Sequence, residues 1–211
     1  MRTIISFLFI ISFFLASAQT FKPFSGRLVY EITNLDKPND EPLQMSVFSI
    51  DSLVRIETPS PVFGNQAFVK HIIKKKSFLL ISLDQSHNYA IKGDFDKADS
   101  VVRDKKYYWK KKFGSKKIAG IKSKKLRLTF KKSNKSFNCL YAKNISAKYL
   151  DAYNDFPGLP TEYYLETEDG ILKYSLLKIE YTTPHYDLFG IPSNYELVTF
   201  DEFVNILTQG K

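Results

Sequence analysis

Apolar and polar residues alternate along many short stretches of this chain, and this alternation constrains the fold more than any other feature. Leu126, Leu128 and Phe130 are separated by Lys125, Arg127 and Thr129. Because successive side chains of a strand point to opposite faces, this period of two predicts a strand with an apolar face and a basic face. The same period recurs from residues 24–33 onward, which predicts a sheet with one covered face.

Clusters of Asn, Asp, Gly and Pro divide the alternating stretches, as is typical of antiparallel hairpins. The high content of Phe and Tyr also favours strands. The sequence therefore predicts a mainly β fold, a curved antiparallel sheet with one or two short helices. The predicted strands are residues 24–33, 43–50, 53–58, 66–73, 77–83, 88–92, 116–122, 124–131, 136–143, 163–167 and 171–181, with an extended piece at 193–199. The predicted helices are residues 144–154 and 201–207, the second capped by Asp201.

A proline-bounded turn precedes the last two long strands. Pro157 and Pro160 each fix φ and remove a backbone donor, which predicts that this piece is neither helix nor central strand. Gly158, directly after a proline, is predicted to take the positive φ of a type II turn. A second tight turn is predicted at residues 168–170, ending in Gly170.

The first residues have the three parts of a secretory signal peptide. A single positive charge at Arg2 precedes an apolar run at residues 3–15, and Ala16-Ser17-Ala18 follows it. A retained anchor is the alternative, but the run is shorter than the roughly 20 residues that cross a bilayer. We expect residues 1–18 to be removed and residues 19–211 to form one domain that is exported to the periplasm or envelope. Since Cys139 is the single cysteine, an internal disulfide is excluded, and its apolar neighbours predict a core residue.

Several short motifs occur in the order found in a known family. They are Gly26-x-Leu28-x-Tyr30, residues 118–122 (Ile-Ala-Gly-Ile-Lys), residues 139–142 (Cys-Leu-Tyr-Ala), the Pro157–Pro160 turn with its strands, and the tail at residues 187–195. This order resembles the GLPGLI family of exported Bacteroidota proteins, although Thr161-Glu162-Tyr163 stand where Gly-Leu-Ile would be. Such proteins look like relatives of the periplasmic lipoprotein carriers. The resemblance implies a half-barrel whose concave apolar face, covered by helices or loops, holds an acyl chain or other apolar group, and it supplies no catalytic residue.

No catalytic or cofactor signature is present in the sequence. There is no Gly-x-Ser-x-Gly elbow, phosphate loop or dinucleotide fingerprint, and His71, His87 and His185 lie too far apart for a spaced pair of metal ligands. We therefore expect a non-enzymatic protein, without cofactor or metal, that binds a hydrophobic ligand, a lipid or a lipidated partner. The expected lining residues share the apolar face of the predicted strands: Leu28, Tyr30, Val54, Ile56, Leu79, Ile81, Leu126, Leu128, Phe130 and Tyr164.

The formal net charge is +9, and the lysines occur in groups. Lysines around Tyr107, Tyr108 and Trp109 suit single-stranded nucleic acid, which an exported protein rarely meets, so no nucleic acid partner is expected. Anionic head groups are a better match for such patches, and plain solvated faces or protected strand edges are the simplest interpretation. The second candidate function is accordingly an interaction module that docks by its basic face on an anionic envelope surface or partner, with no ligand. The sequence does not predict the oligomeric state.

Overall fold

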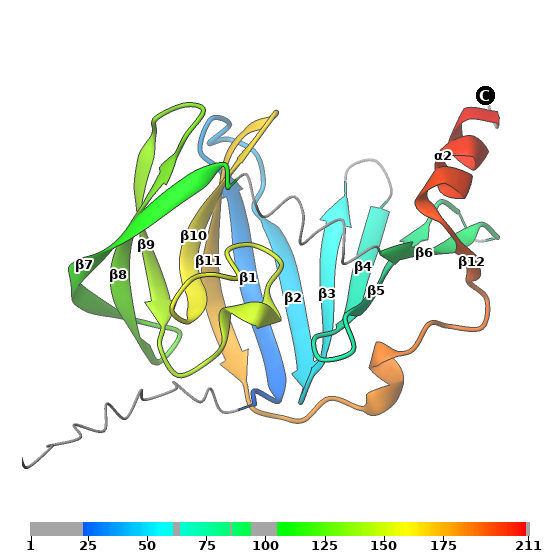
Figure 1. The fold of residues 1–211 in the computed structure, drawn as a ribbon, viewed down its shortest axis with the longest axis horizontal. Coiled ribbons are helices and arrows are strands. Elements are labelled where there is room, and N and C mark those ends of the chain that lie inside the picture. The colour runs from blue at the N-terminus through cyan, green and yellow to red at the C-terminus, as the bar shows by residue number, and fades with distance from the viewer. Residues whose placement is uncertain (1–22, 61–63, 85, 94–104, 210–211) are drawn as a thin grey trace, which may run out of the picture.

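Twelve strands form one curved sheet that does not close on itself (Figure 1). The computed structural model describes residues 23–60, 64–84, 86–93 and 105–209, so the expected signal peptide lies outside the described residues. The strand order is β12-β6-β5-β4-β3-β2-β1-β11-β10-β9-β8-β7, which leaves β12 and β7 at the edges. The predicted mainly β, curved and largely antiparallel architecture is confirmed.

Figure 1 labels the strands and the helix α2 in chain order. The strands are β1 (Gly26–Asn34), β2 (Leu43–Ile50), β3 (Leu53–Ser60), β4 (Gly64–His71), β5 (Lys76–Ser82), β6 (Asn88–Gly93), β7 (Tyr107–Ile118), β8 (Ile121–Phe130), β9 (Ser136–Ala142), β10 (Leu159–Thr167), β11 (Gly170–Glu180) and β12 (Glu196–Val198). The helical elements are η2 (Ala147–Tyr149), η3 (Tyr186–Phe189) and α2 (Phe200–Gln209). Among the described residues, no helix is both long and apolar enough to cross a membrane.

The sheet consists of two meanders. Strands β1 to β6 are neighbours in sequence order, and so are β7 to β11. The first and the eleventh strand join the two meanders, in an antiparallel ladder that runs from Arg27↔Glu180 to Asn34↔Leu172. The exception to the antiparallel pattern is β12, which pairs with β6 in parallel.

The prediction of one continuous strand at residues 116–122 is wrong, because a hairpin turn lies in the middle of this stretch. Ala119 (φ 46°) and Gly120 (φ 83°) are both left-handed, and Ile118 pairs with Ile121 across the turn. Two left-handed residues match the twist of a two-residue hairpin. The first nine residues of the 12-residue strand β7, which ends at this turn, were not predicted as a strand. Its register with β8 shifts between Lys111 and Ser115, so its alternation is broken.

Two predictions for the proline-bounded turn are also wrong. Pro160 lies inside β10, between β9 and β11, where it pairs with Tyr141. The register shifts directly after it, between Pro160 and Glu162, and such an irregularity accommodates a proline within a sheet. Gly158 does not have a positive φ. It is needed for close packing, because a Cβ at this position would lie 2.2 Å from the carbonyl oxygen of Ala142.

The two predicted helices have different outcomes. Residues 144–154 form one 3-10 turn, η2, and Tyr153 takes a left-handed φ of 58° that interrupts a helix. The C-terminal helix is confirmed as α2, but its cap is Thr199 instead of Asp201. The Thr199 hydroxyl accepts the Glu202 N–H at 3.2 Å, and the Glu202 carboxylate accepts the Thr199 N–H at 2.7 Å. This reciprocal pair is a capping box.

Three apolar clusters cover different parts of the sheet. The main core lies on the concave face, between β1–β3, β8–β11 and residues 143–158, which we call the covering segment. Phe189 of η3 packs on the second cluster, with Ala67, Val69 and Leu80. Phe203 of α2 packs edge-on against Tyr89 in the third cluster, at the β6 end of the sheet.

Candidate functional site

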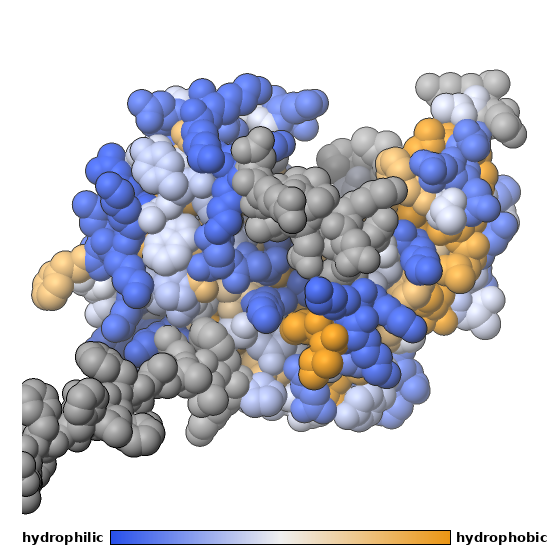
Figure 2. Space-filling model, viewed as in Figure 1, coloured by the Kyte–Doolittle hydropathy of each residue, from blue (hydrophilic) through white to orange (hydrophobic). Residues whose placement is uncertain are grey.

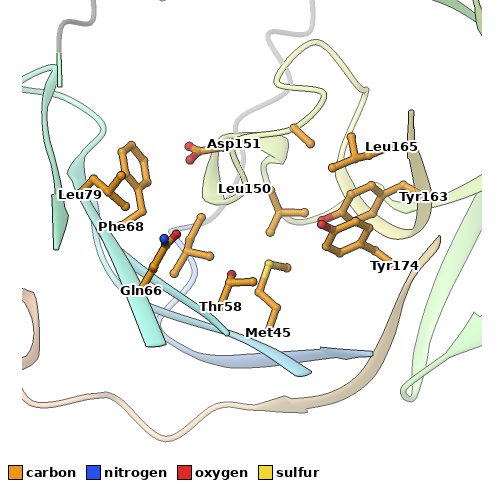
Figure 3. A pocket seen from close by; sticks show the side chains of 12 residues that line it. Met45, Thr58, Gln66, Phe68, Leu79, Leu150, Asp151, Tyr163, Leu165 and Tyr174 are labelled. Atoms are coloured by element: carbon orange, nitrogen blue, oxygen red, sulfur yellow. The ribbon is translucent and has the colours of Figure 1, made fainter. Parts of the chain in front are cut away.

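A half-open pocket of about 200 Å³ lies between the concave face of the sheet and the covering segment (Figure 3). Strands β2 to β5 form one wall and β10 and β11 form the other, while the covering segment lies over both. The lining is mainly apolar, with Thr58, Gln66 and Asp151 as its polar members apart from two tyrosines. The lining residues are Met45, Ile56, Thr58, Gln66, Phe68, Leu79, Leu150, Asp151, Ala152, Tyr163, Leu165 and Tyr174.

The strand register determines which side chains lie next to each other within each wall of the pocket. Ile56 pairs with Phe68, and Phe68 pairs with Leu79, so these three side chains form one row across β3, β4 and β5. On the opposite wall, Tyr163 pairs with Tyr174, and their rings stack with centroids 4.6 Å apart. Directly opposed side chains on neighbouring strands lie close enough to form a continuous surface. The pocket is therefore the space that two cross-strand rows leave between them.

The covering segment is packed firmly onto the sheet. Its backbone joins β10, because Leu159 N–H donates to the Ile145 carbonyl at 2.8 Å. The Tyr149 hydroxyl donates to the Asp51 carbonyl at 3.1 Å and accepts the Phe24 N–H at 2.7 Å. The segment buries six apolar side chains in the main core: Ile145, Ala147, Tyr149, Leu150, Tyr153 and Phe156.

A buried lysine beside the pocket also holds the covering segment. Lys70 of β4 is only 6% exposed, and its Nζ donates to the Leu150 carbonyl at 3.0 Å and to Asp151 Oδ1 at 2.7 Å. Lys70 is not among the residues that the sequence pattern predicts to be functional. Its signal is positional, because Lys70 shares the concave face with Phe68, two residues earlier, where the alternation calls for an apolar side chain.

The two partners of this ion pair are expected to differ in what their loss costs. Asp151→Ala leaves the Lys70 ammonium buried with one carbonyl as partner, and we expect the free energy of unfolding to fall by about 2 kcal/mol. The expected loss of stability is smaller than for a fully buried ion pair, because the Asp151 side chain is 54% exposed. Lys70→Met removes the charge and keeps the volume, so its cost is expected to be no more than about 1 kcal/mol. Urea unfolding of both variants and of the double variant checks this order; equal costs, or a larger loss for Lys70→Met, would contradict it.

A second polar contact holds the other end of the covering segment to the edge strand. Asp155 accepts hydrogen bonds from the Tyr107 hydroxyl at 2.5 Å, Trp109 Nε1 at 2.8 Å and Lys105 Nζ at 3.0 Å. Burial disfavours the charged carboxylate, but these three donors outweigh burial and hold the pKa of Asp155 below its usual value. The rings of Tyr153 and Phe156 stack beside it, 4.6 Å apart. Tyr107 and Trp109, two of the three aromatic residues among the lysines, are therefore held by hydrogen bonds within the protein.

The ten residues expected to line a ligand site have different positions. Ile56 and Leu79 line the pocket. Ile81 is buried in the cluster that packs against α2. Tyr164 stacks on Phe137 with ring centroids 4.4 Å apart. The remaining six are buried in the main core by the protein's own side chains: Leu28, Tyr30, Val54, Leu126, Leu128 and Phe130.

The single cysteine is a core residue, as predicted. Cys139 is free and fully buried, and burial raises the pKa of its thiol to about 12. The thiol is therefore protonated at neutral pH and is a poor nucleophile. Within the described ranges, no group of three His, Cys, Asp or Glu residues is arranged to hold a metal ion.

Comparison with known proteins identifies similar folds and no family. No family model and no curated protein matches the sequence. Two crystal forms of PNGF-II match with TM-scores of 0.54 and 0.55, at 13% and 10% identity, over 88% and 87% of this chain. The chain spans 32% and 33% of the length of those PNGF-II chains, so the likeness concerns the fold of one part of that protein.

Two further solved structures match less closely. MucB, solved in complex with MucA(peri), has a TM-score of 0.44 and 16% identity over 83% of this chain and 57% of its own. An uncharacterised conserved protein from Thermus thermophilus has a TM-score of 0.49 and 11% identity over 83% of this chain and 91% of its own. The expected relationship to the GLPGLI family is not tested by these comparisons and stays a prediction.

Proposed function

We propose that this chain is a non-enzymatic binding protein of the periplasm or envelope that holds a small apolar group beneath its covering segment. The observation that carries the proposal is the apolar pocket of about 200 Å³ on the concave face. Apolar surface that is exposed in a pocket gains free energy when a ligand covers it. The pattern of a signal peptide at residues 1–18 supports an exported location.

The size of the pocket limits the ligand. Sites for whole drug-sized molecules usually enclose about 300–1,000 Å³, whereas an engineered apolar cavity of about 150 Å³ in another protein binds benzene. A pocket of about 200 Å³ suits one ring or the end of an acyl chain. Thr58 and Gln66 offer hydrogen-bonding groups for a polar end of the same molecule. The ligand class is therefore a lipid tail, a lipidated partner or a small ring compound.

The chemistry of the lining supports binding without catalysis. Among the described residues that line the pocket there is no histidine, cysteine or serine, and the one carboxylate among them, Asp151, is paired with Lys70. Burial raises the pKa of Tyr163 well above its usual value, and it raises that of Tyr174 too, so both hydroxyls stay neutral. General acid–base chemistry requires a group with a pKa near the working pH.

Filling the pocket is expected to weaken ligand binding without unfolding the protein. Thr58→Trp puts a large ring into the half-open pocket. The apolar probe is N-phenyl-1-naphthylamine, whose phenyl ring is small enough for the pocket, and we expect its affinity to fall about tenfold or more, since covered apolar surface contributes about 25 cal/mol per Å². Thr33→Trp is the matched control, because Thr33 follows the inward-facing Ile32 on β1 and points to the other face of the sheet. A fluorescence titration of both variants measures the difference.

Native mass spectrometry of the wild-type protein purified from its own host tests the proposal directly. The expected result is residues 19–211 carrying an apolar adduct that the Thr58→Trp variant lacks. Bare protein alone, together with equal probe binding by both tryptophan variants, would refute the proposed function.

A further inference from the structure

Positive charge is concentrated at one end of the sheet. From Lys105 to Leu150 the chain has 16 of its 31 Lys and Arg residues and none of its 22 Asp and Glu residues. Strands β7 to β9 and their two turns contain 12 of these basic residues, and all 12 are exposed. Figure 2 shows mainly hydrophilic side chains over this end of the molecule. Such a field attracts an anionic surface over a distance set by the salt concentration.

A fully exposed phenylalanine projects from the same region. Phe113 lies on the edge strand β7 and is 103% exposed, more than any other large hydrophobic residue of the described chain. It lies in the bulge where β7 and β8 lose register, between Lys111–Lys112 and Lys116–Lys117. The neighbouring Gly114 has a φ of 109°, and a Cβ there would lie 3.4 Å from the Lys125 side chain. The bulge therefore presents one large apolar ring with lysines around it.

Strand protection and nucleic acid binding explain these features less well. Lysines and a bulge do protect an edge strand from pairing with another chain, but an exposed phenylalanine works against that protection. A protein that binds single-stranded nucleic acid needs exposed aromatic rings on which the bases stack. Two of the three aromatic residues at the start of β7, Tyr107 and Trp109, instead donate to Asp155 of the covering segment. The arrangement of one apolar anchor within a basic field matches a charged lipid interface.

We propose that the β7–β8 hairpin docks on an anionic lipid bilayer, with Phe113 inserted at the boundary of head groups and acyl chains and the surrounding lysines on the head groups. This surface is separate from the pocket, so the inference does not depend on the proposed ligand. An apolar ring supplies contact that survives salt, whereas the lysines supply attraction that salt screens. The two contributions can therefore be separated by experiment.

Co-sedimentation with vesicles of phosphatidylglycerol and phosphatidylcholine, compared with phosphatidylcholine alone, tests the proposal. Binding is expected on the anionic vesicles only and is expected to weaken as salt rises. Removing two lysines, Lys111→Gln with Lys112→Gln, is expected to lower the partition coefficient roughly 25-fold, at about fivefold per lysine. Phe113→Ser is expected to lower it about tenfold. The tenfold loss is expected to persist at every salt concentration that allows binding.

Matched controls change the same chemistry elsewhere. Phe200→Ser removes an exposed phenylalanine from α2. Lys37→Gln with Lys74→Gln removes two exposed lysines that are distant in sequence from the β7–β8 hairpin. Both control variants are expected to bind the vesicles like the wild type. Equal losses for the lysine pairs, or no loss for Phe113→Ser, would overturn the proposed surface. So would binding to a single-stranded oligonucleotide that is as tight as vesicle binding and indifferent to Phe113→Ser.

Discussion

Replacing Gly158 with alanine is expected to lower the free energy of unfolding by about 3 kcal/mol or more, the upper range for an atom forced into a packed site. The added Cβ would lie 2.2 Å from the Ala142 carbonyl oxygen and 3.0 Å from the Cα of Lys143. Both contacts are backbone atoms, so no flexible side chain can move aside. The clash falls where the covering segment leaves β9 and returns as β10. Urea unfolding followed by circular dichroism measures the loss.

The matched control for this variant is Gly190→Ala. Gly190 has an ordinary extended φ of −80°, and the nearest heavy atom to an added Cβ is the Asp187 carbonyl oxygen at 3.4 Å. Its change in stability is expected to stay within about 0.5 kcal/mol. If Gly158→Ala were as mild as Gly190→Ala, the close approach of the two strands at this point would be disproved.

Leu150→Ala is expected to lower the free energy of unfolding by about 3 kcal/mol, because Leu150 is 1% exposed and its removal leaves a cavity. That cavity adjoins the pocket, since Leu150 lines it. The Leu150 carbonyl still accepts from Lys70, which keeps the backbone of the covering segment in place. The variant is therefore expected to bind the naphthylamine probe more tightly than the wild type does.

Leu177→Ala on β11 provides the comparison for Leu150→Ala. Leu177 is 47% exposed, so its truncation is expected to cost less than about 1 kcal/mol and to leave probe binding unchanged. Probe binding that weakens in Leu150→Ala, in protein that is still folded, would show that the probe does not occupy this pocket.

Local patterns were sufficient to predict most of the sheet. Several apolar stretches bounded by turn residues, such as residues 43–50 and 171–181, occur as β2 and β11 with bounds within one residue of the prediction. The amphipathic C-terminal helix was also predicted, although its cap lies two residues earlier than expected. In these elements the local pattern and the tertiary packing agree, which is the condition for prediction from sequence.

The remaining features depend on contacts between distant residues. Most of strand β7 was missed because a bulge and a run of exposed lysines hide its alternation. The pocket depends on which residues face each other across strands, as Ile56 and Phe68 do, and on a covering segment that arrives from another part of the chain. Of the ten residues expected to line a ligand site, Ile56 and Leu79 lie at the pocket. An apolar face alone does not show which of its side chains the protein covers for itself.

The ladder between β1 and β11 has a consequence for how the molecule is assembled. Strand β1 is complete at Asn34, but its partner β11 runs from Gly170 to Glu180, so the chain has to be synthesised through β11 before this ladder can form. Until then β1 is an edge strand of the partly formed sheet, and its unpaired backbone groups can pair with other chains. Pairing over such sequence separation also slows folding. Until β11 is available, the exposed edge of β1 therefore favours aggregation of the nascent protein, the kind of event that chaperones generally counteract.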